Sequence, residues 1–136
     1  MSTNQELFEL KFYEWEKKFK DKPYLRQPFG DEWEEYTWGK VGDMARRLAT
    51  GLKSLGLRDG AHIGIYSKNC REWIISDLAI VMAGYVSVPF FPSLNGKELS
   101  YIMEYGDVDA LFIGKIETWD DIKNDLPSDI PVITYP

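Results

Sequence analysis

The second half of the sequence alternates between short apolar runs typical of strands and apolar stripes typical of helices. Four strand-like runs begin near residues 61, 86, 110 and 132. This spacing is too short for separate domains and fits consecutive strand–helix–strand units with right-handed crossovers. Because such crossovers join parallel strands, the pattern predicts an α/β fold with a mainly parallel sheet of about four strands and flanking helices. We expect the strands at 61–67, 86–91, 110–113 and 132–135, and helices starting near 69, 95 and 118.

An amphipathic helix and a short β-hairpin are predicted ahead of this repeat. Aromatic side chains recur on one face of the helix expected at 5–20, and the step into Pro23 ends that helix. Residues 24–36, with Gly30 in the middle, have the pattern of two strands joined by a turn. The aromatic face of the helix consists of Phe8, Phe12, Trp15 and Phe19. The chain is divided accordingly into a helical arm (1–22), a hairpin (23–38) and strand–helix repeats (39–136).

The most regular helix is expected between the capping residue Thr37 and Leu55. Gly56 follows where a left-handed residue commonly ends a helix. Gly51 lies inside this helix and costs about 1 kcal/mol relative to alanine. Two interpretations stay open for it: close packing against another backbone, or a glycine that is merely tolerated.

Two later helices share a start signal in which asparagine is followed three residues later by glutamate. In such a capping box, each side chain satisfies a backbone N–H of the other residue. The pairs are Asn69 with Glu72 and Asn95 with Glu98. Asparagine replaces the more usual serine or threonine in both.

Composition excludes several classes of protein. With 136 residues the chain has room for one core, and a formal charge of −6 argues against a nucleic-acid surface. The acidic excess lies entirely after residue 60, and basic partners or neutral ligands remain open. Cys70 is the only cysteine, which excludes an intrachain disulfide and indicates a reducing compartment, so we expect a cytoplasmic chain. No leader and no run of 18 apolar residues is present, so no membrane span is expected.

Aromatic residues make up 15% of the chain, which is high for its length. They either fill an unusually aromatic core or belong in part to an interface. The few predicted helices also give the sheet lean cover, although a parallel sheet needs both faces covered.

The loops that follow the strands contain no strong ligand motif. Open α/β sheets bind ligands beyond the carboxyl ends of their strands, which here are 67–69, 91–95 and 114–118. Neither the glycine-rich dinucleotide fingerprint nor the P-loop pattern occurs. Residues 67–69 can hold an anion through backbone N–H groups and Lys68, or can simply cap a helix beside a solvated lysine.

Isolated polar residues are more simply explained by structure than by catalysis. His62, the only histidine, can build neither a metal cluster nor a triad by itself. Cys70 near a helix start has a weak tendency toward the thiolate, but an ordinary half-buried thiol explains it better. The acidic residues Asp107, Asp109, Asp120, Asp121 and Asp125 are expected on a solvated surface. We therefore predict no catalytic, cofactor-binding or metal-binding residues in this chain.

Read together, the segments between residues 24 and 114 resemble the opening of AMP-forming acyl-CoA synthetases. The order Asn-x-x-Glu-Trp at 69–73, followed by Gly-x-Val-x-Val-Pro at 84–89, is most similar to the long-chain fatty-acid branch. The remaining matching pieces are Tyr36-Thr37-Trp38, Ala45, Leu48-Ala49, Gly51-Leu52, Leu55-Gly56-Leu57, Gly60, Ile63-Gly64-Ile65, Ser67-Lys68, Asp77-Leu78-Ala79-Ile80, Pro92-Ser93-Leu94 and Glu98-Leu99-Ser100-Tyr101-Ile102.

The resemblance implies an enzyme that joins a fatty acid to ATP, releases pyrophosphate and transfers the acyl group to coenzyme A. It implies ATP, Mg²⁺ and coenzyme A for the whole ligase, whose phosphate loop, adenine-binding segment and catalytic lysine have no counterpart here. The chain is expected to be an inactive N-terminal portion, with the remainder of the ligase as its partner. Residues 88–92 are then expected to lose neighbours and to offer apolar surface for self-association.

Three alternatives stay open. One is a relative in the same superfamily that activates an aryl or amino acid. Another is a free-standing flavodoxin-like binding module without catalysis. The last is a signalling domain, which would need an acidic pocket at the strand ends, and Tyr66-Ser67-Lys68 supplies none.

Overall fold

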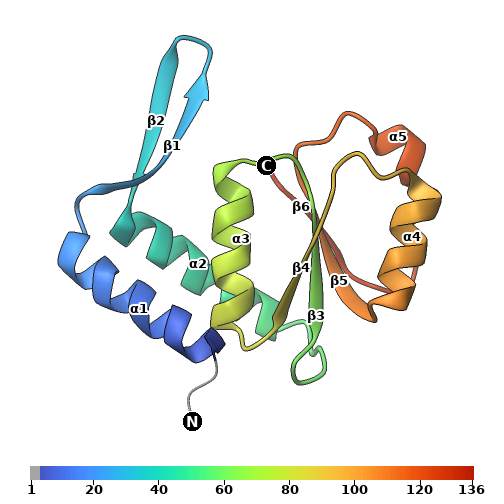
Figure 1. The fold of residues 1–136 in the computed structure, drawn as a ribbon, viewed down its shortest axis with the longest axis horizontal. Coiled ribbons are helices and arrows are strands. Elements are labelled where there is room, and N and C mark those ends of the chain that lie inside the picture. Colours follow the sequence, from blue (N-terminus) through green and yellow to red (C-terminus); the bar gives the residue numbers. More distant parts are fainter. Residues whose placement is uncertain (1–3) are drawn as a thin grey trace.

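A four-stranded parallel sheet forms the centre of the structure, as the sequence predicts. The computed structural model describes residues 4–136, and the sheet has the strand order β4–β3–β5–β6 (Figure 1). Since β4 and β5 flank β3, the connection from β4 to β5 crosses β3. The strands are β3 (His62–Tyr66), β4 (Val86–Phe90), β5 (Val108–Ile113) and β6 (Val132–Thr134).

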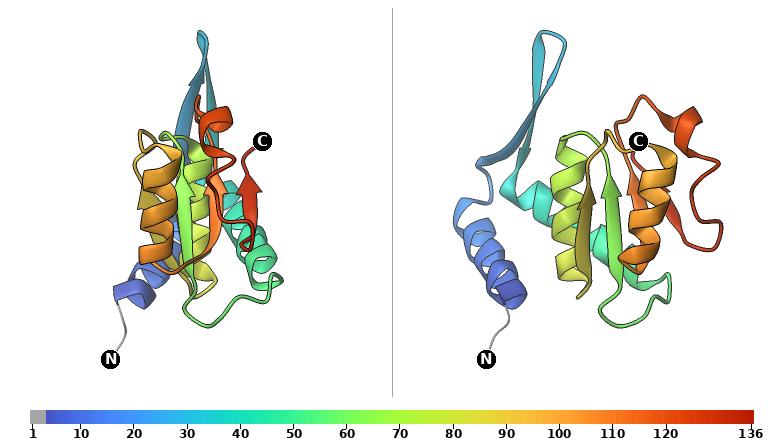
Figure 2. Two further views of the ribbon diagram at one scale, coloured as in Figure 1. Left: turned by 90° about the vertical axis from the view of Figure 1, so that its right-hand side faces the viewer. Right: turned by 45° about the vertical axis from the view of Figure 1, so that its right-hand side comes forward.

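Helices cover the sheet on both faces. Helices α2 (Trp38–Lys53) and α3 (Arg71–Met82) lie on one face, and α4 (Gly96–Tyr105) and α5 (Trp119–Ile122) lie on the other (Figure 2). Side chains of β3 alternate between two apolar clusters, with Ile63 and Ile65 in the cluster under α2 and α3, and Tyr66 in the cluster under α4 and α5. All three are 0% exposed, so the expected lean cover does not apply to the central strand.

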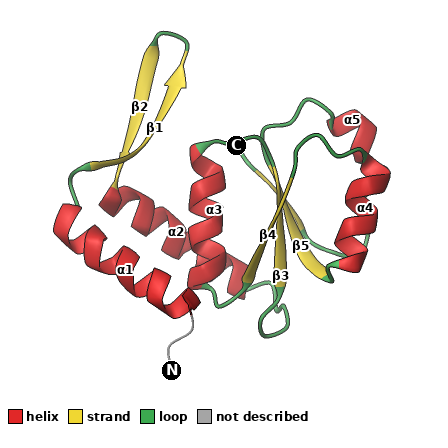
Figure 3. Ribbon diagram, viewed as in Figure 1, coloured by secondary structure: helices red, strands yellow, loops and turns green. Residues whose placement is uncertain are grey.

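The predicted N-terminal helix and hairpin precede the sheet. Helix α1 (Asn4–Phe19) packs on α2, and the antiparallel strands β1 (Pro23–Phe29) and β2 (Glu32–Thr37) project beyond the helices (Figure 3). Of the aromatic face of α1, Phe12 is buried at 4% exposure, whereas Phe8 and Trp15 are 47% and 43% exposed. The helical spacing was correct, but it did not predict how much of that face is buried.

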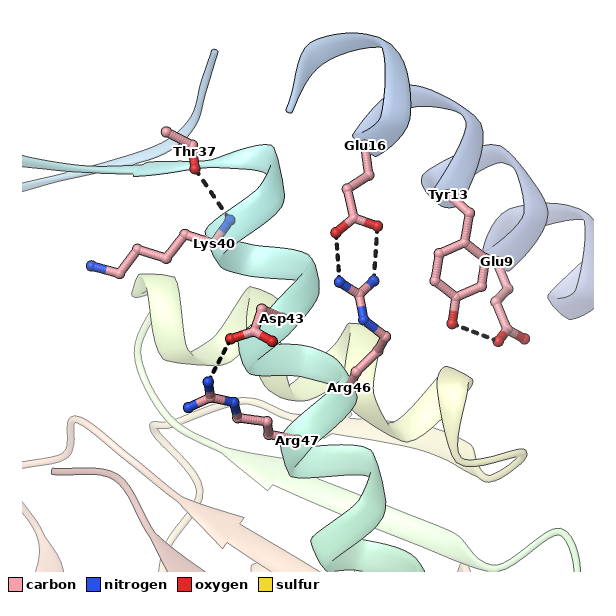
Figure 4. A network of polar contacts seen from close by, with 8 residues as sticks. All are labelled: Glu9, Tyr13, Glu16, Thr37, Lys40, Asp43, Arg46 and Arg47. Carbon is pink, nitrogen blue, oxygen red and sulfur yellow. Dashed lines mark hydrogen bonds and ion pairs between the residues drawn. The ribbon is translucent and has the colours of Figure 1, made fainter. Parts of the chain in front are cut away.

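Polar contacts join α1 to α2. Arg46 of α2 donates two hydrogen bonds of 2.8 Å to the Glu16 carboxylate of α1, and the Tyr13 hydroxyl donates to Glu9 at 3.1 Å (Figure 4). The Arg46 guanidinium also lies 5.9 Å from the centre of the Tyr13 ring. Glu16 thus joins α1 to α2 through Arg46.

The predicted start of α2 is confirmed, and its predicted end is not. The Thr37 hydroxyl accepts a hydrogen bond from the Lys40 N–H at 3.1 Å. Gly56 has the left-handed φ of 68°, but α2 ends at Lys53 with Ser54 as its C-cap, two residues earlier than expected. Gly51 has no neighbour within 4 Å of the position that a Cβ would take. The close-packing interpretation of Gly51 is therefore wrong, and this glycine is merely tolerated.

The two predicted capping boxes behave differently. At α4 both bonds are present: Glu98 N–H donates to Asn95 at 3.0 Å, and Asn95 N–H donates to Glu98 at 2.9 Å. The box predicted at Asn69 and Glu72 is wrong, because the N-cap residue of α3 is Cys70, which makes no side-chain cap. Instead the Arg71 N–H donates to the Gln27 side-chain oxygen of the hairpin at 2.8 Å. A residue distant in sequence replaces the local cap.

An irregularity in β5 positions an ion pair at the amino end of the sheet. The β3–β5 register shifts between His62 and Ile63, which leaves Asp109 as the extra residue in β5. Its carboxylate accepts from the His62 N–H at 2.8 Å and pairs with Arg58 at 2.9 Å. Burial alone would raise the pKa of Asp109, but the hydrogen bonds from Arg58 and His62 outweigh burial and lower it.

Within residues 4–136, no helix combines the length and the apolar character needed to cross a bilayer.

The contrast between the two predicted caps gives a direct test. Replacing Asn95 with alanine removes the bond that its side chain accepts from the Glu98 N–H and should lower the free energy of unfolding by about 1 kcal/mol. Asn69→Ala is the matched control and should change it by less than half as much, since Asn69 makes no cap. Urea unfolding of both variants measures the difference, and equal losses would contradict this account of the caps.

The Asp109 ion pair predicts a specific dependence of stability on pH. Because its pKa is lowered in the folded state, the stabilisation is fully present above the unfolded pKa of about 3.9 and disappears as pH falls through the lower folded value. Asp109→Asn should therefore be less stable than the parent chain at neutral pH, with the gap closing in acid. Urea unfolding across this pH range measures the gap. Asp21→Asn, at an exposed carboxylate without an ion pair, should show no such closing gap, and a constant gap for Asp109→Asn would contradict the assignment.

Candidate functional site

The carboxyl ends of β3 and β5 flank the place where an open sheet of this topology would bind a ligand. The chain leaves β3 toward β4 on one side and reaches β5 on the other, so the strand order reverses between β3 and β5. The loops at this switch point are 67–69 and 114–118. The hairpin and the C-terminal end of the chain lie at this same edge (Figure 1).

The chain's own atoms close the switch point. The Ser67 hydroxyl accepts a hydrogen bond from the Lys115 N–H at 2.9 Å, and the Lys68 N–H donates to the Lys115 carbonyl at 3.0 Å. A Cβ at Gly114 would collide with the Tyr135 ring and the Ser67 hydroxyl. The Tyr135 ring also packs 6.0 Å from the Phe112 ring, and burial raises the pKa of its hydroxyl. The expected ligand position is therefore filled by Tyr135 and by two loops bound to each other.

The loop after β4 is fastened to the same edge. The Tyr66 hydroxyl, at the end of β3, donates toward the carbonyl oxygens of Leu94 at 2.7 Å and Pro92 at 3.1 Å. The three loops singled out by the sequence thus do come together, but they bind one another.

Two open grooves lie beside the closed switch point. The first, here called the β4 groove, has a volume of about 450 Å³, and Lys68 is its only charged liner. Lys68 pairs with Glu117 at 2.6 Å, and the neighbouring Phe91 is 79% exposed. Lining residues of the β4 groove are Ser67, Lys68, Asn69, Trp73, Pro89, Phe90, Phe91 and Pro92.

The second groove lies between the hairpin and α3 and has a volume of about 380 Å³. Asn69 and Trp73 line both grooves, so the two are adjacent. Its other lining residues are Leu25, Arg26, Gln27, Pro28, Cys70, Arg71 and Ile74. The arrangement can receive an apolar segment along the outside of the carboxyl edge.

Arg71 holds the hairpin against α3. Its guanidinium binds Glu72 at 2.9 Å and also pairs with Glu34 of β2. Its charge lies 4.4 Å from the centre of the Tyr36 ring and 5.0 Å from that of Phe29. Burial alone would lower the pKa of Arg71, but the hydrogen bonds to Glu34 and Glu72 raise it. The sequence analysis missed both Arg71 and Gln27, because no local pattern signals a contact between the hairpin and α3.

The isolated polar residues take structural positions. Cys70 is half-buried, and burial raises the pKa of its thiol, which fits the ordinary thiol expected for it. His62 lies at the opposite end of the sheet, with Nδ1 2.7 Å from the Gly106 carbonyl oxygen. Asp109 pairs with Arg58, and Asp120 pairs with Lys123 at 2.6 Å.

At the switch point, the described residues do not fit the nucleotide and Mg²⁺ that the resemblance implies. Tyr135 fills the switch point where phosphates would bind. Among residues 4–136, no three histidine, cysteine or acidic side chains are arranged to hold a metal ion. We derive no chemical step from this part of the chain.

Comparison with known proteins identifies a common family. A sequence model described as AMP-binding enzyme matches residues 12–134. Over 77 residues the chain is 34% identical to long chain acyl-CoA synthetase 5 of Arabidopsis thaliana, a match covering 57% of this chain and 12% of that protein. It is 26% identical over 102 residues to the long-chain-fatty-acid–CoA ligase ACSBG2 of Mus musculus, covering 75% of this chain and 15% of that protein.

Solved structures share the fold. The anthranilate CoA ligase AuaEII, in complex with anthranoyl-AMP, has a TM-score of 0.78 to this chain at 23% identity. That likeness covers 93% of this chain and 24% of that ligase. The chain therefore matches only a small part of the length of the proteins it is similar to.

Closure of the switch point predicts opposite effects at two glycines. Gly114→Ala places a methyl group against Tyr135 and Ser67 and should destabilise the chain by about 1–3 kcal/mol. Gly51→Ala is the control in open space and should stabilise it by up to about 1 kcal/mol. Thermal or urea unfolding measures both, and a Gly114 variant as stable as the parent would show that the switch point has room.

Proposed function

The chain belongs to the AMP-binding enzyme family, and from this premise we propose that it acts as the N-terminal subdomain of a longer, ATP-dependent long-chain fatty-acid–CoA ligase. The whole ligase would convert a fatty acid, ATP and coenzyme A to acyl-CoA, AMP and pyrophosphate. The observation that carries the proposal is the match to long chain acyl-CoA synthetases, at 34% identity over 77 residues.

Within such a ligase the chain would serve as a scaffold and as a wall for a site built largely from other residues. The filled switch point supports this role, because it leaves no room for a ligand between β3 and β5. The β4 groove supports it as well, since Trp73 and the exposed Phe91 offer apolar surface to neighbouring parts of a larger protein. The self-association expected at residues 88–92 stays a prediction. In this segment Pro89 and Phe91 are exposed, whereas Phe90 is buried.

The proposal assigns ATP, Mg²⁺ and coenzyme A to the remainder of the ligase. It also places the protein in the cytoplasm, for which the single cysteine gives support from sequence.

The second candidate is a relative that activates another carboxylic acid. Its support is the similar fold of AuaEII, whose name specifies anthranilate. The choice between the two depends on which acid a longer polypeptide containing these residues accepts.

A pyrophosphate-release assay tests the proposal that the catalytic residues of the ligase lie outside this chain. With ATP, Mg²⁺ and a long-chain fatty acid, the 136-residue chain should release no more pyrophosphate than a heat-denatured sample. Turnover clearly above that control would show that the chemistry lies within these residues.

A second test examines the reading frame of the gene and the activity of its full product. We expect the reading frame to continue beyond the codon for Pro136, and its product to release pyrophosphate faster with a long-chain fatty acid than with anthranilate or an amino acid. A stop codon directly after Pro136 would contradict the proposal, and faster turnover with anthranilate would favour the second candidate.

A further inference from the structure

The two faces of the β1–β2 hairpin make different kinds of contact. Side chains alternate between the faces of a strand, so the register of β1 with β2 assigns each residue to a face. The pair Gln27–Glu34 lies on one face, here called the inner face because it contacts α3, and the pair Arg26–Glu35 lies on the outer face. The inner face holds Gln27, Phe29, Glu34 and Tyr36, and the outer face holds Arg26, Trp33 and Glu35.

All four inner-face side chains contact one residue of α3. Arg71 donates its backbone N–H to Gln27 at 2.8 Å and donates from its guanidinium to Glu34. The same guanidinium lies over the rings of Phe29 and Tyr36, at 5.0 and 4.4 Å from their centres. A single residue therefore joins both strands of the hairpin to the first turn of α3.

Contacts of the outer face stay within the hairpin. Arg26 pairs with Glu35 across the strands at 2.8 Å and lies 5.3 Å from the centre of the Trp33 ring. These contacts do not change if the hairpin moves away from α3. Residues 28–35 are all exposed, so little buried surface opposes such a movement.

The base of the hairpin is fixed more firmly than its outer part. The rings of Tyr24 and Trp38 stack with their centres 4.0 Å apart, and both pack against the cluster under α2 and α3. The register of β1 with β2 shifts between Pro23 and Leu25, and such an irregularity bends a strand. The base therefore has the features of a hinge, beyond which residues 26–35 project (Figure 3).

We propose that residues 26–35 form a flap that opens away from α3 while the sheet stays folded, and that Arg71 is the latch that holds the flap closed. Within residues 4–136, the one further polar or ring contact from the flap to the rest of the chain is made by Lys115, 5.4 Å from the centre of the Phe29 ring. The proposal does not rest on the proposed function, since both sides of the latch lie within the described residues.

Opening of the flap changes the groove between the hairpin and α3. One wall of that groove consists of residues 25–28, and the other includes Cys70 and Arg71. The latch therefore sets the width of this groove. Lys115 also connects the flap to the switch point, because its backbone N–H binds the Ser67 hydroxyl.

The Arg71 amide reports opening directly. As the first residue of α3, Arg71 has no carbonyl partner within the helix, so its N–H is protected only while Gln27 accepts it. The Ile75 N–H, one turn later, bonds inside α3 and is the reference for fraying of that helix. In hydrogen exchange of the 136-residue chain, corrected for intrinsic rates, we expect Arg71 to exchange at least about tenfold faster than Ile75 but more slowly than an unprotected amide.

Two neighbouring glutamates separate the latch from the rest of the hairpin. Glu34→Gln removes the ion pair with Arg71, whereas Glu35→Gln removes the pair with Arg26 on the outer face. The first variant should speed exchange of the Arg71 amide about two- to fivefold and leave Ile75 unchanged, and the second should change neither. Arg71→Gln, which also loses both ring contacts, should speed exchange at residue 71 by on the order of tenfold or more.

Three results would overturn the proposal. An Arg71 amide that exchanges no faster than Ile75 would show that the flap opens only when α3 unfolds. Equal effects of Glu34→Gln and Glu35→Gln would show that Arg71 is not the latch. Acceleration of both reporter amides by Glu34→Gln would assign the effect to fraying of α3. Circular dichroism checks that each variant is folded, and both glutamates are exposed, so their replacement leaves the core intact.

Discussion

The structure depends on the burial of β3 between two strands and two layers of helices. Ile63, Ile65 and Tyr66 are completely shielded from water, with the first two and the third on opposite faces. A parallel strand buried on both faces needs apolar cover on each side, and the crossovers through α3 and α4 supply it on opposite faces. The same crossovers bring the loops after β3, β4 and β5 to one edge. Tyr66 links the core to that edge, because its hydroxyl binds the loop after β4.

This arrangement explains why a topology that usually offers a ligand crevice offers none here. The loops after β3 and β5 satisfy each other's polar groups, and Tyr135 of the segment following β6 covers Gly114. The two open grooves lie beside the switch point, near β4 and the hairpin. Their surface is largely apolar, and their charged residues Lys68 and Arg71 already form ion pairs. Such a surface suits contact with further protein better than chemistry on a small molecule, which agrees with a chain that matches only part of its long-chain acyl-CoA synthetase relatives.

The sequence predicted those features that depend on local periodicity and on local hydrogen bonds. Strand spacing predicted the parallel sheet, and the Asn95 box and the Thr37 cap were correct because each involves only nearby residues. Features that depend on distant contacts were missed. Gln27 caps α3 from the hairpin, Phe8 and Trp15 lie on an aromatic face that α2 covers only in part, and Tyr135 closes the switch point from the far end of the chain. The sequence placed the candidate loops at the correct edge, but no motif could show that they bind one another.

The central claim is that the switch point between β3 and β5 is occupied by the chain itself. Titration of the isotopically labelled chain with ATP and Mg²⁺, followed through its amide resonances, tests this claim most directly. The account predicts no saturable shifts at Ser67, Gly114 or Tyr135. Saturable shifts at these three amides would contradict it, because they would show that a nucleotide enters the place assigned to Tyr135.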